Sequence, residues 1–172
     1  MAGCPVEIER KYLIAYPDRE LLRKTEGVRI WEITQTYLTS ESGETARVRR
    51  IVEEDTVRFV YTSKRRLSDL SALEEERDLT YAEYEDLLHR ADPDRNPVKK
   101  TRYRIPHEGF VCEIDVYPFW SDRAVLEIEL PDENTQAPIP PYVKVYRDVS
   151  DDKRYKNASL AKSIPVDIID ME

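Results

Sequence analysis

The sequence has few of the residues on which several common classes of site depend. Of its 172 residues, two are cysteine, two are histidine and four are glycine. Cys4 and Cys112 are too few and too far apart to predict a disulfide framework, and no cysteine or histidine has the spacing of a zinc site. So little glycine also argues against the glycine-rich phosphate loop of a P-loop enzyme.

Long apolar runs and an excess of positive charge are missing as well. No stretch approaches the roughly 20 apolar residues that cross a bilayer, and the first residues contain no apolar signal core. The formal net charge is −8, whereas a protein that binds duplex nucleic acid usually presents a basic face. We therefore expect a cytoplasmic protein that binds neither nucleic acid nor membrane, with a single domain over residues 1–172.

Charge is abundant, and much of it falls within segments whose pattern is typical of strands. Charged residues make up 36% of the chain. Alternation and β-branched or aromatic content predict strands over residues 6–14, 28–38, 45–52, 56–64, 73–79, 98–105, 109–117 and 124–130. Because most of these strands are joined by short turns, the pattern predicts an α+β protein built on an antiparallel meander.

Three helices are expected beside these strands. The first covers residues 19–24, with Asp18 as its N-cap. The second covers residues 80–91, where Thr80 and Glu83 have capping-box spacing. The third covers residues 157–162 with Asn157 as its cap, and the proline-rich stretch 132–142 before it predicts a loop.

Most of the predicted strands have one apolar face and one charged face. An ordinary sheet with one solvated face would explain this, because charges usually lie in solvent. However, charges of the same sign recur two residues apart, as at Arg47 and Arg49 or Glu127 and Glu129, and such pairs bring no local benefit to a strand. A closed eight-stranded barrel with a charged lumen explains both features, since closure removes the sheet edges and leaves room for a small ligand.

The mixture of charges predicts the class of ligand. The basic residues on the charged faces are Lys11, Arg47, Arg49, Lys64, Lys100 and Arg102. The acidic residues are Glu7, Glu9, Glu113, Asp115, Glu127 and Glu129. Guanidinium forks and ammonium groups bind phosphate oxygens, and carboxylates without histidine or cysteine suit Mg²⁺ or Mn²⁺. A polyphosphate with bound metal ions would use both sets.

The order of these residues resembles that of the CYTH superfamily, also called triphosphate tunnel metalloenzymes. Its hallmark E-x-E-x-K is matched at residues 7–11. The further motifs follow in family order: R-x-R at 47–49, T-x-K at 62–64, an acidic pair at 74 and 76, K-x-R-Y at 100–103, E-x-D at 113–115 and E-x-E at 127–129. Residues 148–155 resemble E-V-T-x-D-x-R-Y, although Arg147-Asp148 replaces Lys-Glu and Ser150 replaces Thr.

The resemblance implies an eight-stranded antiparallel tunnel and a role for each group of residues. It implies metal binding by Glu7, Glu9, Glu127, Glu129 and Asp115. It implies phosphate binding by Lys11, Arg47, Arg49, Lys64, Lys100, Arg102 and Arg147. It implies that the catalytic groups are among Glu113, Asp115 and Lys100.

The function that the resemblance favours is metal-dependent hydrolysis of a triphosphate, with inorganic tripolyphosphate as the substrate and orthophosphate as a product. Three alternatives stay open: a class IV-type adenylyl cyclase, a thiamine triphosphatase, and a non-catalytic polyphosphate or nucleotide binding module. A cyclase would need an adenine pocket, for which Gln35, Tyr37 and Tyr103 are candidates, although packing explains each more simply. The expected partner is the small-molecule triphosphate, bound by a monomer or a homodimer.

Overall fold

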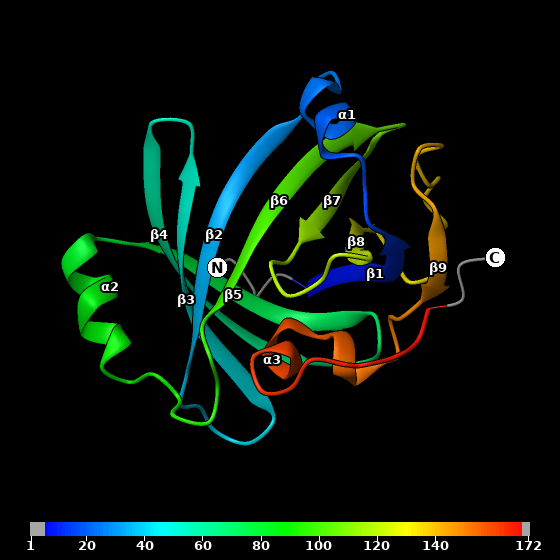
Figure 1. Ribbon diagram of the computed structural model, residues 1–172. Coiled ribbons are helices and arrows are strands. Elements are labelled where there is room, and N and C mark those ends of the chain that lie inside the picture. The colour runs from blue at the N-terminus through cyan, green and yellow to red at the C-terminus, as the bar shows by residue number, and fades with distance from the viewer. Residues whose placement is uncertain (1–5, 170–172) are drawn as a thin grey trace.

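Eight antiparallel strands close into a barrel in the computed structural model, which describes residues 6–169 and therefore leaves Cys4 outside the described range. The strands follow one another around the barrel in the order β5-β4-β3-β2-β6-β7-β8-β1, and β1 then pairs with β5, with Val6 opposite Leu73 and Ile8 opposite Ser71 (Figure 1). They are β1 (Val6–Ala15), β2 (Arg29–Leu38), β3 (Glu44–Glu53), β4 (Thr56–Arg66), β5 (Ser71–Leu79), β6 (Val98–His107), β7 (Phe110–Val116) and β8 (Arg123–Glu129). The predicted closed antiparallel barrel is confirmed.

A ninth strand, β9 (Val145–Asp148), was not expected from the sequence. It pairs with the later part of β1, beyond the residues that pair with β5, with Tyr12 opposite Asp148 and Ile14 opposite Val145. Its four residues are too few to show an alternating pattern. The proline-rich stretch before it is a loop, as predicted.

Two of the three helices begin as their sequences predict. The Asp18 carboxylate accepts hydrogen bonds from the backbone N–H groups of Glu20 and Leu21 at the start of α1 (Arg19–Lys24). Thr80 and Glu83 form a complete capping box at α2 (Tyr81–Leu88), which ends earlier than expected.

The predicted cap of the third helix was wrong. A 3₁₀ helix, η1 (Lys153–Tyr155), precedes α3 (Asn157–Leu160), and Lys156 occupies the cap position without a side-chain hydrogen bond. Asn157 is already helical, and its side-chain oxygen accepts a hydrogen bond from the Tyr117 hydroxyl at 2.5 Å. The side chain that would have capped the helix is thus used to hold α3 against β7.

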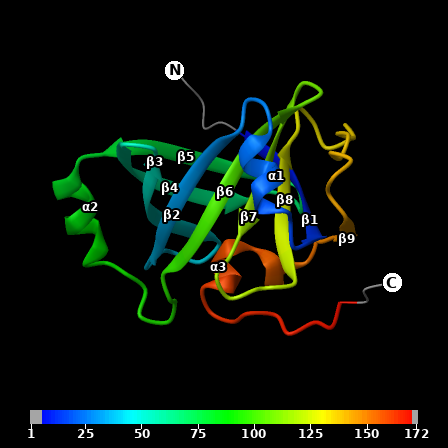
Figure 2. The same ribbon diagram turned by 45° about the horizontal axis from the view of Figure 1, so that its top comes forward.

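Much of the apolar core lies outside the barrel rather than within it. Leu22 of α1 and the loop before β9 cover a cluster formed by β6, β7 and β8 (Figure 2). Tyr84 of α2 packs with Val48 and Leu79 over β3 to β5. A third cluster closes one end of the lumen, where Val149 and Leu160 pack against Val125. In residues 6–169, no helix combines the length and apolar content needed to cross a bilayer.

We expect Leu22→Ala to destabilise the fold much more than Leu21→Ala. Leu22 is 1% exposed and is the buried residue of α1, whereas Leu21 is 40% exposed. Truncating a fully buried leucine costs about 2–5 kcal/mol, and the same change at the surface costs roughly 0.5 kcal/mol or less. Urea unfolding of the two variants measures the difference. Equal losses would show that α1 does not depend on this contact.

Candidate active site

The charged faces of the strands line a single cavity of about 560 Å³ inside the barrel. The alternation that predicts strands places every second side chain in this lumen. The predicted site residues on its wall are Glu7, Glu9, Lys11, Arg47, Arg49, Lys64, Arg102, Glu113, Glu127 and Glu129. The structure therefore brings together residues from strands that are far apart in the sequence.

Carboxylates gather where β1 lies beside β8. Glu9 is directly opposite Glu129 in the strand register, and Glu7 is two residues away on the same face. Burial and repulsion by Glu127 and Glu7 raise the pKa of Glu9 to about 8, and burial also raises the pKa values of Glu7 and Glu129. Burial and mutual repulsion therefore disfavour full ionisation of the cluster, which a bound cation would favour.

One lysine reaches into this cluster. Lys64 Nζ lies 3.0 Å from Glu7 Oε1, 3.4 Å from Glu74 and 3.9 Å from Glu9. Within residues 6–169, no three acidic, histidine or cysteine side chains are already gathered as a metal-binding group. The donor chemistry nevertheless fits a hard divalent cation, because all available ligand atoms are carboxylate oxygens. Glu7, Glu9 and Glu129 are the residues that could converge on one.

Guanidinium groups form the facing wall. Arg49 of β3 donates to Glu76 at 3.0 Å, but its Nε and the Nε of Arg47 are buried without a hydrogen-bond partner. Burial, together with repulsion by Arg47 and Arg102, lowers the pKa of Arg49 to about 9. Buried donors without acceptors are costly, and the oxygens of a phosphate would satisfy them while neutralising the crowded positive charge.

Lys100 and Asp115 lie on the lumen face of their strands, but they are buried and do not line the open cavity. Both side chains are 0% exposed, with Lys100 Nζ 2.8 Å from Asp115. Arg102 forms two hydrogen bonds with the same carboxylate, at 2.7 and 2.8 Å, and reaches Glu113 at 3.2 Å. Both oxygens of Asp115 are therefore in use, and the geometry gives Asp115 the role of holding Arg102 towards the lumen.

Arg147 lies apart from the other predicted phosphate-binding residues. It belongs to β9, which is not one of the eight strands that close the barrel, and its guanidinium is 3.2 Å from both Asp152 and Asp167. The Asp167 carboxylate also accepts a hydrogen bond from the Tyr155 hydroxyl at 2.7 Å. Arg147 thus takes part in anchoring the C-terminal segment against η1, and it does not line the lumen in the described chain.

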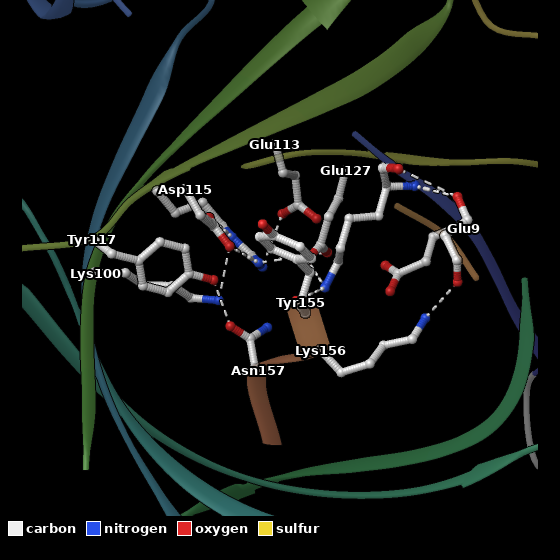
Figure 3. A network of polar contacts seen from close by, with 12 residues as sticks. Glu9, Lys100, Glu113, Asp115, Tyr117, Glu127, Tyr155, Lys156 and Asn157 are labelled. Carbon is white, nitrogen blue, oxygen red and sulfur yellow. Dashed lines mark hydrogen bonds and ion pairs between the residues drawn. The ribbon is translucent and has the colours of Figure 1, made fainter. Parts of the chain in front are cut away.

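The sequence analysis gave no site role to the lining residues that lie outside the barrel strands, although residues 148–155 match a family motif. Around the C-terminal segment these are Ser150, Asp151, Lys153, Lys156, Asn157 and Ser159. In Figure 3, Lys156 extends beneath Glu9 while Asn157 meets Tyr117 near Lys100. The acidic and basic residues around α3 are visible in the sequence, but no strand pattern places them in the lumen.

Only one of the three candidate adenine-binding residues lines the cavity. Tyr37 lies on its wall. Gln35 is fully buried within the barrel, with both amide atoms unpartnered, and does not line it. The Tyr103 hydroxyl accepts a hydrogen bond from Arg19 of α1 at 2.8 Å, which places it on the outer face. The described residues thus provide little of an adenine pocket.

Comparison with known proteins finds both similar sequences and similar structures. No protein-family model matches the chain. A protein of Nitrosomonas europaea named inorganic triphosphatase is 34% identical over 164 residues, 92% of this chain and 99% of that protein. One of the same name from Acetivibrio thermocellus is 29% identical over 158 residues, 91% and 94% of the two chains.

The crystal structure of an inorganic triphosphatase has the same fold. It superposes with a TM-score of 0.56 and 30% identity, covering 96% of this chain and 98% of the other. The similarity in sequence thus extends over nearly the whole barrel, including the strands that carry the charged lumen. By this similarity the chain belongs to the inorganic triphosphatases of the CYTH superfamily.

Proposed function

We propose that this protein hydrolyses inorganic tripolyphosphate to orthophosphate and pyrophosphate, with Mg²⁺ or Mn²⁺ as its cofactor. The observation that carries the proposal is the arrangement of the lumen, where carboxylates of β1 and β8 face guanidinium groups of β3 and β6 within one cavity. The two relatives named inorganic triphosphatase support the same activity. The predicted cytoplasmic location is part of the proposal, as is a monomer or a homodimer.

The basic wall would bind and orient the phosphate chain. Arg47, Arg49 and Arg102 offer guanidinium donors to oxygens on which charge builds up during phosphoryl transfer. Asp115 fixes Arg102 before substrate arrives, so little reorganisation is needed at the moment of reaction.

The acidic wall would hold the metal and orient water. Glu7, Glu9 and Glu129 would bind the cation, which would neutralise phosphate charge and polarise a phosphoryl oxygen. Arg102 and Arg104 hold the Glu113 carboxylate at 3.2 and 3.1 Å, in a position to orient the attacking water. The water oxygen would bond to the terminal phosphorus as the bridging P–O bond breaks. Pyrophosphate would leave, and the water's proton would pass through Glu113 to solvent.

A product assay tests this function against its alternatives. Purified protein is incubated with tripolyphosphate, ATP or thiamine triphosphate, each with Mg²⁺ and with Mn²⁺. We expect orthophosphate from tripolyphosphate at the highest rate, and none when EDTA removes the metal. Cyclic AMP with pyrophosphate from ATP would instead establish a cyclase, a preference for thiamine triphosphate would change the substrate, and binding without turnover would leave a binding module.

We expect Glu9→Gln to abolish turnover while leaving the protein folded. The amide keeps the size of the side chain but removes a charge that the metal would need. Glu85→Gln, on the exposed face of α2, removes the same charge far from the lumen and should keep the wild-type rate. Near wild-type activity of Glu9→Gln at saturating metal would disprove the assignment of Glu9.

The metal-free Glu9→Gln protein should also be more heat-stable than the wild type at high pH. Because the pKa of Glu9 is raised from 4.5 to about 8 in the fold, its ionised form is disfavoured there relative to the unfolded chain. The wild type therefore loses stability as pH rises from 4.5 to about 8, and the advantage of the variant grows over that window. Melting curves in EDTA across the window measure it.

Arg49→Ala should weaken the binding of tripolyphosphate by about 1.5–3 kcal/mol, the range for a hydrogen bond to a charged group. Arg49→Lys should restore only part of this, because the planar fork is lost. The neighbouring Arg50 is exposed and points away from the lumen, so Arg50→Ala is a matched control. Titration calorimetry gives the affinities, and equal affinities for Arg49→Ala and Arg50→Ala would exclude a phosphate contact at Arg49.

A further inference from the structure

A second cavity, of about 350 Å³, lies on the outer face of the barrel, where residues of β2, β3, β6, α1 and the loop after β7 surround it. Figure 2 shows α1 lying over this face beside β6. None of the residues that line this outer cavity also lines the lumen. Lys100 borders it, but the Lys100 ammonium group is bonded to Asp115 at 2.8 Å. The volume falls within the range of roughly 300–1,000 Å³ that is typical of pockets for small molecules.

Two exposed cations stand on either side of a hydroxyl in this outer cavity. The strand register places Arg50 of β3 and Lys99 of β6 directly opposite Thr34 of β2, one on each side. Neighbouring strands are about 4.8 Å apart, so the backbones of the two basic residues lie roughly 10 Å apart. In the part of the chain that the structure describes, neither side chain forms a hydrogen bond or an ion pair. Both are therefore free to bind a ligand between them.

A third cation, Arg19 of α1, is held in place by neutral groups. Its Nε donates to the Tyr103 hydroxyl at 2.8 Å, and its second terminal nitrogen donates to the Thr101 hydroxyl at 3.3 Å. The one carboxylate on the wall is that of Glu32, whose oxygens accept from the Thr101 hydroxyl at 2.9 and 3.0 Å. Within residues 6–169, Glu32 forms no ion pair with the three cations. Positive charge therefore exceeds negative charge here, and an anion is the ligand that this excess attracts.

Rings form the other part of the wall. Tyr16, Tyr117, Pro118 and Trp120 line the same cavity as the cations. The Trp120 ring packs edge-on against Tyr117, with 5.5 Å between the ring centroids, so its position is fixed by the packing of its neighbours. Lysines and arginines on the outside of a sheet usually need no ligand, because water solvates them. Rings that share a concave site with unpaired cations are different, since together they suit a ligand with both a planar body and a negative charge.

We propose that the outer cavity binds a small organic anion in which an oxyanion group is attached to a planar ring. The oxyanion lies between Arg50 and Lys99, close to the Thr34 hydroxyl, and the ring lies against Trp120. Two kinds of molecule share this chemistry, aromatic phosphate esters and aromatic carboxylates. The site is separate from the lumen and does not depend on the hydrolysis proposed there.

The two tryptophans of the chain allow binding at the two cavities to be measured separately, because Trp31 lines the lumen and Trp120 lines the outer cavity. The Trp31→Phe protein therefore reports on the outer cavity through Trp120 fluorescence. It is titrated, with EDTA present, with phenyl phosphate and with benzoate. Benzamide supplies the ring without the charge, and orthophosphate supplies the charge without the ring. We expect a saturable change in fluorescence with phenyl phosphate, benzoate or both, and binding at least about tenfold weaker for benzamide and orthophosphate.

Charge-removing variants in the same background test the cations. Arg50→Gln/Lys99→Gln should raise the dissociation constant of the bound anion about tenfold, the scale of two partly screened ion contacts. Both side chains are exposed and unbonded, so their loss leaves the fold intact. The matched control, Lys24→Gln/Arg65→Gln, removes the same charge from exposed positions that line neither cavity and should bind as its parent does. Calorimetry should find the affinity of both variants for tripolyphosphate within about threefold of the wild type, because the outer charges are distant from the lumen.

The outcomes also separate the two kinds of ligand. Binding of phenyl phosphate alone identifies phosphate esters, and binding of benzoate alone identifies carboxylates. The inference is overturned if neither compound gives a saturable change, if the charge-removing variant and its control bind equally, or if orthophosphate binds as tightly as phenyl phosphate. Should Trp31→Phe fail to fold, calorimetry of the protein with both tryptophans, its lumen saturated with tripolyphosphate, measures the same constants. No readout depends on turnover, so an inactive protein would count only against the proposed function.

Discussion

The pairing of β1 with β5 closes the sheet, and the electrostatics of the lumen depend on that closure. It sets Glu7 of β1 against Lys64 and Glu74 of the neighbouring strands. On an open sheet these side chains would be solvated and screened, since salt screens exposed charges beyond about 10 Å at 0.1 M ionic strength. Within the barrel they are partly removed from water, so each unpaired charge acts strongly on its neighbours.

Closure also reverses the usual arrangement of a small domain, in which the apolar side chains fill the centre. The apolar faces of the strands point away from the lumen and need cover from outside, which α1, α2 and the loop before β9 provide. Stability therefore comes mainly from the outer layers, while the interior keeps crowded charges that oppose folding. Such local conflict is typical of sites shaped for a ligand rather than for stability.

The sequence predicts well on which face of a strand a side chain lies, but it does not predict how deeply that side chain is buried in the barrel. Alternation placed Glu113 and Asp115 on one face, and they do share it. Glu113 nevertheless lines the cavity, whereas Asp115, two residues further along β7, is 0% exposed. Both oxygens of the Asp115 carboxylate are bonded to Lys100 and Arg102. That difference depends on strand tilt and on how neighbouring side chains fill the barrel, which a period of two does not encode.

Segments without a strand pattern were the other source of error. The four residues of β9 and the turns around α3 take their places through tertiary contacts, so Arg147 was expected near phosphate and the lysines at 153 and 156 were not. Asn157 shows the same limit, because its side chain accepts a hydrogen bond from Tyr117, just after β7, instead of capping the adjacent helix.

The absence of a glycine-rich loop has a consequence for how this barrel can evolve. A phosphate loop recognises its ligand largely through backbone N–H groups, so a change in specificity usually requires a change in backbone shape. Here most of the wall of the lumen consists of side chains at alternate positions of regular strands. Replacing one of them alters the charge or reach of a single position and leaves the ladder of backbone hydrogen bonds intact. The ligand preference of such a barrel can therefore change through single substitutions.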